Sequence, residues 1–303
     1  MADLNEYTPP TSASIAKRQN DDEALRLLLA QRRLYTKAKR WQGVRWIGLI
    51  VLGVAAPFIS ILLPLLAVAV GAVTGLWLFV GRTWLASAEA RTMTRAAAIQ
   101  EELDLYIFDM PKTIERTSLP TLEEIELLVR SDVSLREAAI REELINWYDV
   151  DPSHPAAETV AIAQRANASY TDSLIRSAVR VWAAVTAIWL TGLIVWSALS
   201  GLAFGLILLG VMFPVLPAVL DVAEYLRSTW RAAQDRGDLA KTIQSRIEDD
   251  QPISGQELIA WQVQMYDLRR TTPQVPDWLY KLRRNTNETA MHAAAARLRS
   301  KKK

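Results

Sequence analysis

The chain has 303 residues, and its 35 basic and 33 acidic residues leave a formal net charge of only +2, which gives no general attraction to DNA or RNA. It contains no cysteine, so disulfides, thiolate metal sites and cysteine nucleophiles are excluded. The two histidines, His154 and His292, lie far apart in the sequence, and we expect both at the surface and no metal site.

The first 40 residues predict a leader followed by a helix. Residues 1–20 are polar, include Pro9 and Pro10, and lack the apolar stretch of a signal peptide, so we expect a short disordered leader. Residues 21–40 predict a basic helix outside the membrane, with a leucine-rich stretch in its first half.

An uncharged block then extends from residue 46 to residue 81. One helix needs about 20 apolar residues to cross a bilayer, so this block is too long for one span and predicts a hairpin of two spans over residues 41–84. Pro57, Ser60 and Pro64 predict the reversal. Because the hairpin is tight, a re-entrant pair of helices that does not fully cross the membrane is the alternative.

A second uncharged block extends from residue 181 to residue 220 and predicts a second hairpin. Ser197, Ser200 and Gly201 predict its reversal. Neither block contains Asp, Glu, Lys, Arg or His, the residues that pumps and coupled carriers usually place at depth in the membrane. Any conducting path is therefore expected between subunits and not within one chain.

The remaining residues, 85–180 and 221–303, return to a charged composition and predict helices outside the membrane. The second span is expected to continue as a helix over residues 86–102. A helix that follows the proline-rich break at residues 151–155 is expected to lead directly into the third span. Three further helix starts have capping-box spacing: Thr121 with Glu124, Ser134 with Glu137, and Ser254 with Glu257.

Basic residues flank the outer ends of both hairpins, among them Arg82 after the first and Arg236 after the second, whereas neither reversal carries a charge. By the positive-inside rule, both hairpins enter from the cytoplasm and return to it, which places both termini and the central segment there. The sequence thus predicts an all-α, multi-pass integral membrane protein, with four spans in two hairpins and a helical cytoplasmic module.

Two patterns in the spans predict helix packing. Small residues four apart let helix backbones approach closely, and tryptophans seven apart share one helix face. The residues concerned are Gly71 and Gly75, Gly201 and Gly205, and Trp182, Trp189 and Trp196.

Catalytic signatures are absent from the sequence: there is no phosphate-binding glycine loop, no HExxH and no GxSxG. Adjacent carboxylates such as Glu101 and Glu102 are expected on solvated helix faces. We therefore expect a protein that is not an enzyme and has no cofactor.

Several strings outside the spans run in order through nearly the whole chain. They are Arg18-Gln19-Asn20, Ala30-Gln31-Arg32-x-Leu34-Tyr35-x-x-Ala38-Lys39, Ile99-Gln100-Glu101-x-x-Asp104, Gln164-Arg165-x-Asn167-x-x-Tyr170, Gln262 to Arg269, and Val275-Pro276-Asp277-Trp278-Leu279-Tyr280 with Glu288 and Met291. Together these strings resemble the S-4TM family, the SMODS-associated four-transmembrane pore-forming effectors, although this sequence has Leu103 where the family tends to have phenylalanine.

The resemblance implies a bacterial anti-phage role in cyclic-oligonucleotide signalling systems (CBASS). A cGAS-like nucleotidyltransferase would supply a cyclic oligonucleotide as the activating ligand. The effector would then permeabilise the inner membrane, in which it is expected as a homo-oligomer in contact with the lipid bilayer. The alternatives are a membrane-anchored scaffold that recruits a soluble partner, and a small constitutive channel or transporter.

The candidate sensing residues combine guanidinium groups, which suit phosphates, with aromatic rings, which suit bases. They are Arg269, Arg270, Trp278, Tyr280, Arg283 and Arg284. The competing interpretation is that the two aromatic residues pack the last helix onto its neighbours while the arginines face lipid or water.

Overall fold

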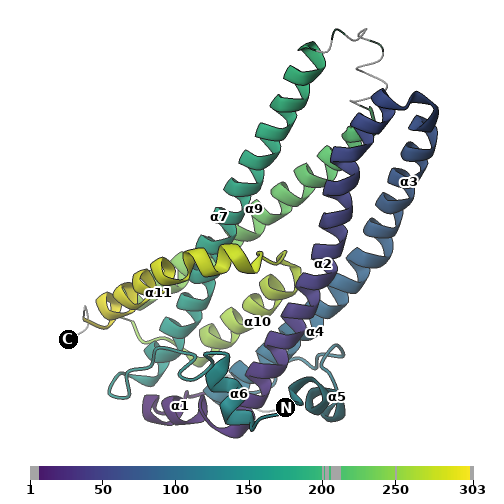
Figure 1. The fold of residues 1–303 in the computed structure, drawn as a ribbon. Coiled ribbons are helices and arrows are strands. Elements are labelled where there is room, and N and C mark those ends of the chain that lie inside the picture. Colours follow the sequence, from purple (N-terminus) through teal and green to yellow (C-terminus); the bar gives the residue numbers. More distant parts are fainter. Residues whose placement is uncertain (1–6, 200, 202–204, 206–212, 250, 301–303) are drawn as a thin grey trace.

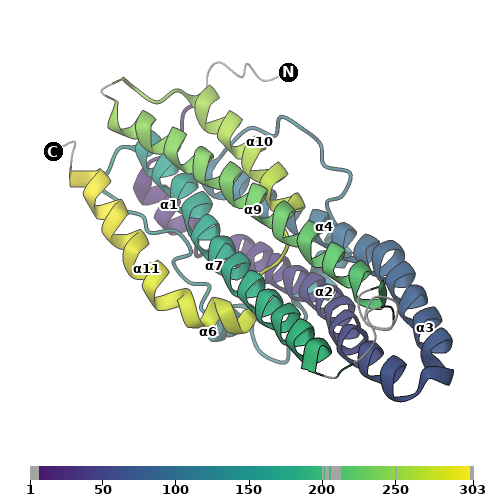
Figure 2. The same ribbon diagram turned by 90° about the horizontal axis from the view of Figure 1, so that it is seen from above.

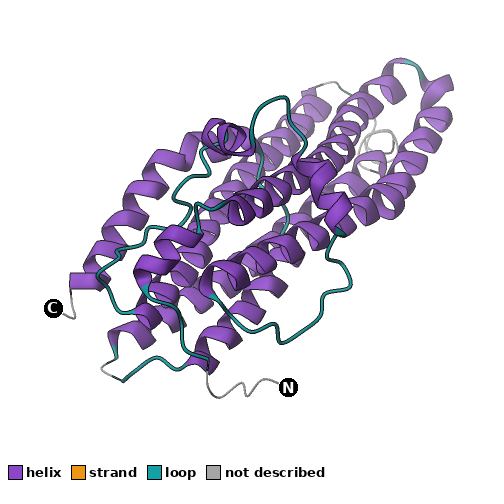
Figure 3. Cartoon of the chain, turned by 90° about the horizontal axis from the view of Figure 1, so that it is seen from below, coloured by secondary structure: helices purple, strands orange, loops and turns teal. Residues whose placement is uncertain are grey.

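The computed structural model describes residues 7–199, 201, 205, 213–249 and 251–300. Their regular structure is entirely helical (Figure 3). A 3-10 turn, η2, and a π-helical turn, η3, interrupt the longer elements. In chain order these are α1 (Ser12–Arg18), α2 (Asp22–Leu62), η2 (Pro64–Leu66), α3 (Ala67–Val80), η3 (Gly81–Leu85), α4 (Ala86–Phe108), α5 (Leu122–Val129), α6 (Leu135–Arg141), α7 (Ala156–Leu199), α9 (Phe213–Glu248), α10 (Gly255–Thr271) and α11 (Asp277–Ser300).

Long helices rise from a helical base (Figure 1). The upper part consists of α2, α3, α7 and α9, and the base contains α1, α5, α6 and α10. Helices α7 and α9 lie side by side along much of their length, which is clear from above in Figure 2, and α2 packs on α4 in the base. α1 and the C-terminal end of α11 lie toward the end of the molecule opposite the α2–α3 turn.

α2 joins the base to the upper part without a break. Its N-terminus is capped by the Asp21 side chain, which accepts a hydrogen bond from the Ala24 backbone N–H at 3.0 Å. Its 41 residues make a helix about 60 Å long, twice the hydrocarbon thickness of a bilayer. Leu25 and Leu28 near its start are fully buried, whereas Ile47 and Val51 in its second half are exposed. Only the second half therefore suits contact with lipid.

Three helical stretches are long and apolar enough to cross a membrane: Asp22–Ile59, Ala67–Phe108 and Ala156–Trp196. They correspond to the first three predicted spans. Most of the residues expected in the first half of the fourth span, 202–204 and 206–212, lie outside the described residues. The all-α class is thus confirmed for the described residues, and three of the four predicted spans are supported by length and composition.

Two local predictions are wrong. Pro57 does not mark the reversal but lies inside α2, which ends at Leu62, and the chain turns through η2. One missing backbone hydrogen bond is tolerated where packing holds the helix on both sides. The leader is also shorter than expected, because residues 12–18 form α1, capped by Thr11 and anchored by the fully buried Ile15.

The base has one large apolar core, to which nearly every helix outside the spans contributes. All three predicted capping boxes are present, at the starts of α5, α6 and α10. As expected, α7 runs unbroken from the loop at residues 151–155 through the third predicted span. α9 likewise extends from the fourth predicted span deep into the base. Both helices therefore join the base to the predicted spans.

Candidate functional site

A buried carboxylate holds the centre of the base together. Asp104 on α4 has no exposed surface, and its Oδ2 accepts hydrogen bonds from Arg269 Nη1 at 2.6 Å and from Gln262 Nε2 at 2.8 Å. The Tyr148 hydroxyl donates to Oδ1. Burial opposes the charge on Arg269, but Asp104 raises the pKa of this guanidinium above its ordinary value. Arg269 therefore stays charged, and its contact with Asp104 fixes α10 on α4.

The strings that carry the family resemblance meet around this pair. Gln19 Oε1 accepts from the Tyr148 backbone N–H at 2.8 Å, and the Tyr35 hydroxyl donates to Gln100 Oε1 at 2.9 Å. Gln164 Nε2 donates to Gln262 Oε1 at 3.2 Å. Burial raises the pKa of Tyr35 to about 12, so its hydroxyl remains a neutral donor. Strings scattered from α1 to α10 thus contribute polar contacts in and around the Asp104–Arg269 pair.

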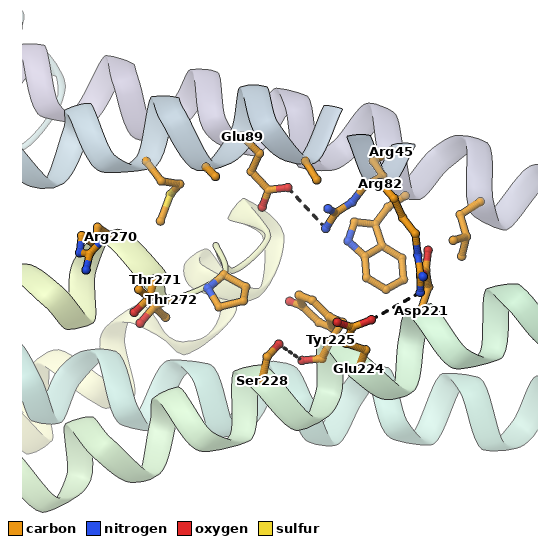
Figure 4. A pocket seen from close by; sticks show the side chains of 16 residues that line it. Arg45, Arg82, Glu89, Asp221, Glu224, Tyr225, Ser228, Arg270, Thr271 and Thr272 are labelled. Carbon is orange, nitrogen blue, oxygen red and sulfur yellow. Dashed lines mark hydrogen bonds and ion pairs between the residues drawn. The ribbon is translucent and has the colours of Figure 1, made fainter. Parts of the chain in front are cut away.

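A second polar region lies where the two predicted hairpins enter the base. It is a cavity of about 480 Å³, drawn in Figure 4, and its walls come from α2, η3, α4, α9 and the end of α10. The Arg82 guanidinium lies against the Asp221 carboxylate and is 3.4 Å from Glu224 Oε2. Arg45 Nη2 is 3.4 Å from Glu89 Oε2. Arg82 on the first hairpin therefore holds α9 of the second.

Aromatic contacts reinforce this junction. Trp46 on α2 stacks on Trp182 of α7, with ring centroids 5.5 Å apart, and meets the edge of Tyr225 on α9 at 5.0 Å. Trp46 thus contacts both helices of the second hairpin. Stacked and edge-to-face pairs at these distances contribute about 0.5–1.5 kcal/mol each beyond area burial.

The C-terminal end of α10 separates the junction cavity from a second cavity deeper in the base. Arg270, Thr271, Thr272 and Pro273 line the junction cavity, and Figure 4 shows the first three facing it from the side opposite Arg82. Thr272 and Pro273 also line the deeper cavity, together with Arg269. One short segment therefore forms a wall of both cavities.

Two of the six predicted sensing residues have described side chains, so the predicted cluster stays a prediction. Arg269 is buried in the pair with Asp104, while Arg270 is exposed, pairs with Asp267 at 2.9 Å and borders the junction cavity. The other four belong to α11, but their side chains lie outside the described residues: Trp278, Tyr280, Arg283 and Arg284. Lys281, between them, borders the deeper cavity.

The residues predicted to pack helices in the membrane differ in their surroundings. Two of the tryptophans lie between the hairpins, where Trp182 stacks on Trp46 and Trp196 meets Phe58 at 4.9 Å. Trp189 packs within the second hairpin, against the cluster of Leu193 and Val215. In contrast, no described atom lies within 4 Å of a Cβ built on the glycines, Gly71, Gly75, Gly201 and Gly205. A packing role for these glycines stays a prediction, and it needs a surface outside the described part of this chain.

Two charged residues differ from their expected roles, and one ion pair was not predicted. Arg236, expected among the basic flanks of the second hairpin, is buried and hydrogen-bonds Thr272. Glu101, expected on a solvated face, is also buried and makes a bidentate pair with Arg116 at 2.7 and 2.9 Å. The Arg82–Asp221 pair was missed, although each is the first charged residue after an uncharged block. Their equal depth in the membrane could have indicated the contact.

Comparison with known proteins agrees with this organisation. Residues 13–298 match the model of the SMODS-associating 4TM effector domain, which is nearly the whole chain. A probable CBASS effector molecule of Bacillus cereus strain VD146 is 24% identical over 314 residues, covering 94% of this chain and 98% of the relative. No solved structure is significantly similar. By the extent of the family match, the chain belongs to the SMODS-associating 4TM effector family.

Proposed function

We propose that this protein is a CBASS effector that senses a cyclic oligonucleotide with its helical base and then permeabilises the bacterial inner membrane as a homo-oligomer. In this arrangement the base and both termini are cytoplasmic, and the spans are the executing part. Membership of the SMODS-associating 4TM effector family supports the defence role, and the similarity to a probable CBASS effector supports the signalling context.

The observation that carries this proposal is the shared wall between the two cavities. Thr272 and Pro273 border both the deeper cavity and the junction cavity. A ligand in the deeper cavity would displace this segment and so change the junction at which Arg82 holds Asp221. Because α7 and α9 are continuous helices, a shift in the base also moves their membrane parts.

An oligomeric pore fits the composition of the spans. The uncharged blocks supply no ionisable residue at depth, so a single chain lacks the groups that usually line an ion pathway. The second half of α2 and all of α3 present exposed apolar side chains, for example Val68 and Leu76. Release of the junction would allow these faces to repack between subunits.

The test is membrane integrity in cells. The protein is expressed with a cognate CBASS nucleotidyltransferase, and membrane potential and uptake of an impermeant dye are followed after activation. We expect depolarisation and dye uptake only when the nucleotidyltransferase is active, with a catalytically dead nucleotidyltransferase as the control.

Depolarisation with either nucleotidyltransferase would favour a constitutive channel instead. An intact membrane, together with stoichiometric capture of a soluble protein, would favour a scaffold. Either result would contradict the proposed function.

A further inference from the structure

The deeper cavity of the base, of about 690 Å³, is strongly basic. Its walls come from α2, α4, the α6–α7 segment, α7, α9, α10 and α11, so it lies where most of the base converges. Among the described residues, six cationic side chains border it against two carboxylates, Glu142 and Glu143. The cationic residues are Arg32, Lys39, Arg141, Arg236, Arg269 and Lys281.

One cation of this cavity has unused donors. Arg269 is 3% exposed and binds Asp104 through Nη1, but its Nε and Nη2 have no hydrogen-bond partner among the described residues. These two nitrogens form one edge of the guanidinium plane, the edge that binds two oxygens of a phosphate or carboxylate side by side. Buried donors are rarely left unpaired, so this edge indicates a missing acceptor.

A second buried cation lines the same cavity. Arg236 is 4% exposed, and its Nε donates to Thr272 Oγ1 at 3.3 Å. Burial and the neighbouring charge of Arg269 lower its pKa to about 10. Asp104 is bound to Arg269, and Asp172 is bound to Arg176 at 2.7 Å. Both carboxylates are therefore already paired, and the described residues supply too little negative charge to balance Arg236 as well as Arg269.

The cavity also offers groups for the rest of a nucleotide. Gln31 is nearly fully buried, and its Oε1, an acceptor, has no hydrogen-bond partner among the described residues. It suits a ribose hydroxyl or a base N–H. Tyr35, Trp147 and Tyr170 border the same space and present rings on which bases can stack.

From these contacts we infer that Arg236 and Arg269 form a buried anion site that binds a phosphodiester group. This inference deepens the proposed function, on which the identity of the ligand as a cyclic oligonucleotide rests. The same chemistry could be supplied by inorganic phosphate or by a phospholipid headgroup, and the experiment separates these sources.

The experiment measures binding by the full chain in a phosphate-free maltoside detergent, in buffer without sulfate. Thermal unfolding and calorimetry are recorded with inorganic phosphate, a panel of cyclic di- and trinucleotides, their linear counterparts, and phosphatidylglycerol added to the micelles. We expect inorganic phosphate to raise the unfolding midpoint weakly and one cyclic oligonucleotide to raise it strongly. We expect no saturable effect of phosphatidylglycerol.

The decisive variant is Arg236→Met, with Arg231→Met as the matched control on an exposed position of α9. Arg236→Met removes an unbalanced buried charge and keeps the Asp104–Arg269 pair. The ligand-free variant should therefore unfold about 2 to 4 °C higher than the wild type. Its affinity for the anion should fall at least about thirtyfold, and Arg231→Met should change neither value.

The outcomes separate the site from the function. Phosphate binding that Arg236→Met abolishes, without binding of any cyclic oligonucleotide, would support the anion site and contradict the proposed ligand. Binding of phosphatidylglycerol alone, lost in Arg236→Met, would support the site and assign it to lipid. No stabilisation by any anion, or Arg236→Met that lowers stability and leaves binding unchanged, would overturn the inference.

Discussion

Gly48 in α2 lies directly against the Trp77 side chain of α3. A Cβ built on Gly48 would lie 2.0 Å from Cε2 of the Trp77 indole, so only glycine fits without moving this ring. Trp77 Nε1 also donates to the Arg45 backbone carbonyl at 3.4 Å. The glycine and the tryptophan thus set the distance between α2 and α3.

We expect Gly48→Ala to lower the free energy of unfolding by about 1–3 kcal/mol, because the rigid indole must shift. The matched control is Gly43→Ala on the same helix, where a Cβ would meet nothing within 4 Å. This control should be neutral or stabilising by up to about 1 kcal/mol, since alanine favours helices. Unfolding in maltoside micelles measures both, and equal effects at the two positions would contradict the close approach.

Asp104 is the residue on which the polar network of the base depends. Asp104→Asn leaves the buried charge of Arg269 without its carboxylate, so we expect a loss of about 3–5 kcal/mol in the free energy of unfolding. Glu102→Gln is the control, because Glu102 is partly exposed and its pair with Lys112 at 3.0 Å contributes about 0–1 kcal/mol. Similar losses in both variants, measured by denaturant unfolding, would show that the Asp104 network is not central.

At the scale of elements, α10 is the helix that connects the two cavities, and its start is capped. Ser254 and Glu257 form the capping box, and Arg246 on α9 pairs with Glu257 at 2.6 Å. Burial tends to raise the pKa of Glu257, but Arg246 and Ser254 lower it below its ordinary value. A carboxyl whose pKa is lowered in the folded state stabilises the fold at pH values above its ordinary pKa. This contribution to stability is lost as the pH falls through the lowered pKa.

The cap is tested by comparing two variants at two pH values. Glu257→Gln should be less stable than the wild type at pH 7, and the difference should shrink as the pH falls below about 4.5, where the wild type loses its carboxylate. Ser254→Ala should cost about 1 kcal/mol at both pH values, because its hydroxyl does not titrate there. Thermal unfolding measures both variants. If the stability difference between Glu257→Gln and the wild type widened in acid, the stabilising role of the Glu257 carboxylate would be refuted.

For the whole molecule, the contact between Arg82 and Asp221 is a charged link between the hairpins, beside the aromatic contacts of Trp46. We expect Arg82→Asp to repel Asp221 and Glu224 and to release dye from liposomes without any ligand. The fraction of protein in the membrane-permeabilising state should rise about fivefold or more, since a partly exposed ion pair contributes about 1 kcal/mol.

The double variant Arg82→Asp with Asp221→Arg restores the opposite charges and should return leakage toward the wild-type level. Continued leakage in the double variant would mean that Arg82 acts on the membrane in another way, for example through lipid headgroups.

Much of this architecture was predictable from local sequence patterns. Uncharged blocks predicted the spans, and Thr121, Ser134 and Ser254 predicted helix starts, because hydropathy and capping act over a few residues. Pro57 was misread because its effect on a helix depends on packing, which local sequence does not encode. The family strings predicted which segments matter, but not that they converge on Asp104. The burial of Arg236 and the Arg82–Asp221 contact depend on how distant helices pack. The local sequence shows only that basic residues follow each uncharged block, so it assigned Arg82 and Arg236 to the membrane flank.

The central claim is that a cyclic oligonucleotide bound in the base opens the membrane. The most direct measurement is dye release from liposomes that contain only the purified protein, with defined cyclic and linear nucleotides added outside to protein whose base faces outward. We expect release with one cyclic oligonucleotide, none with its linear form, and none in Arg236→Met. Release that is the same with and without nucleotide, or no release with any nucleotide that binds the base, would contradict the claim.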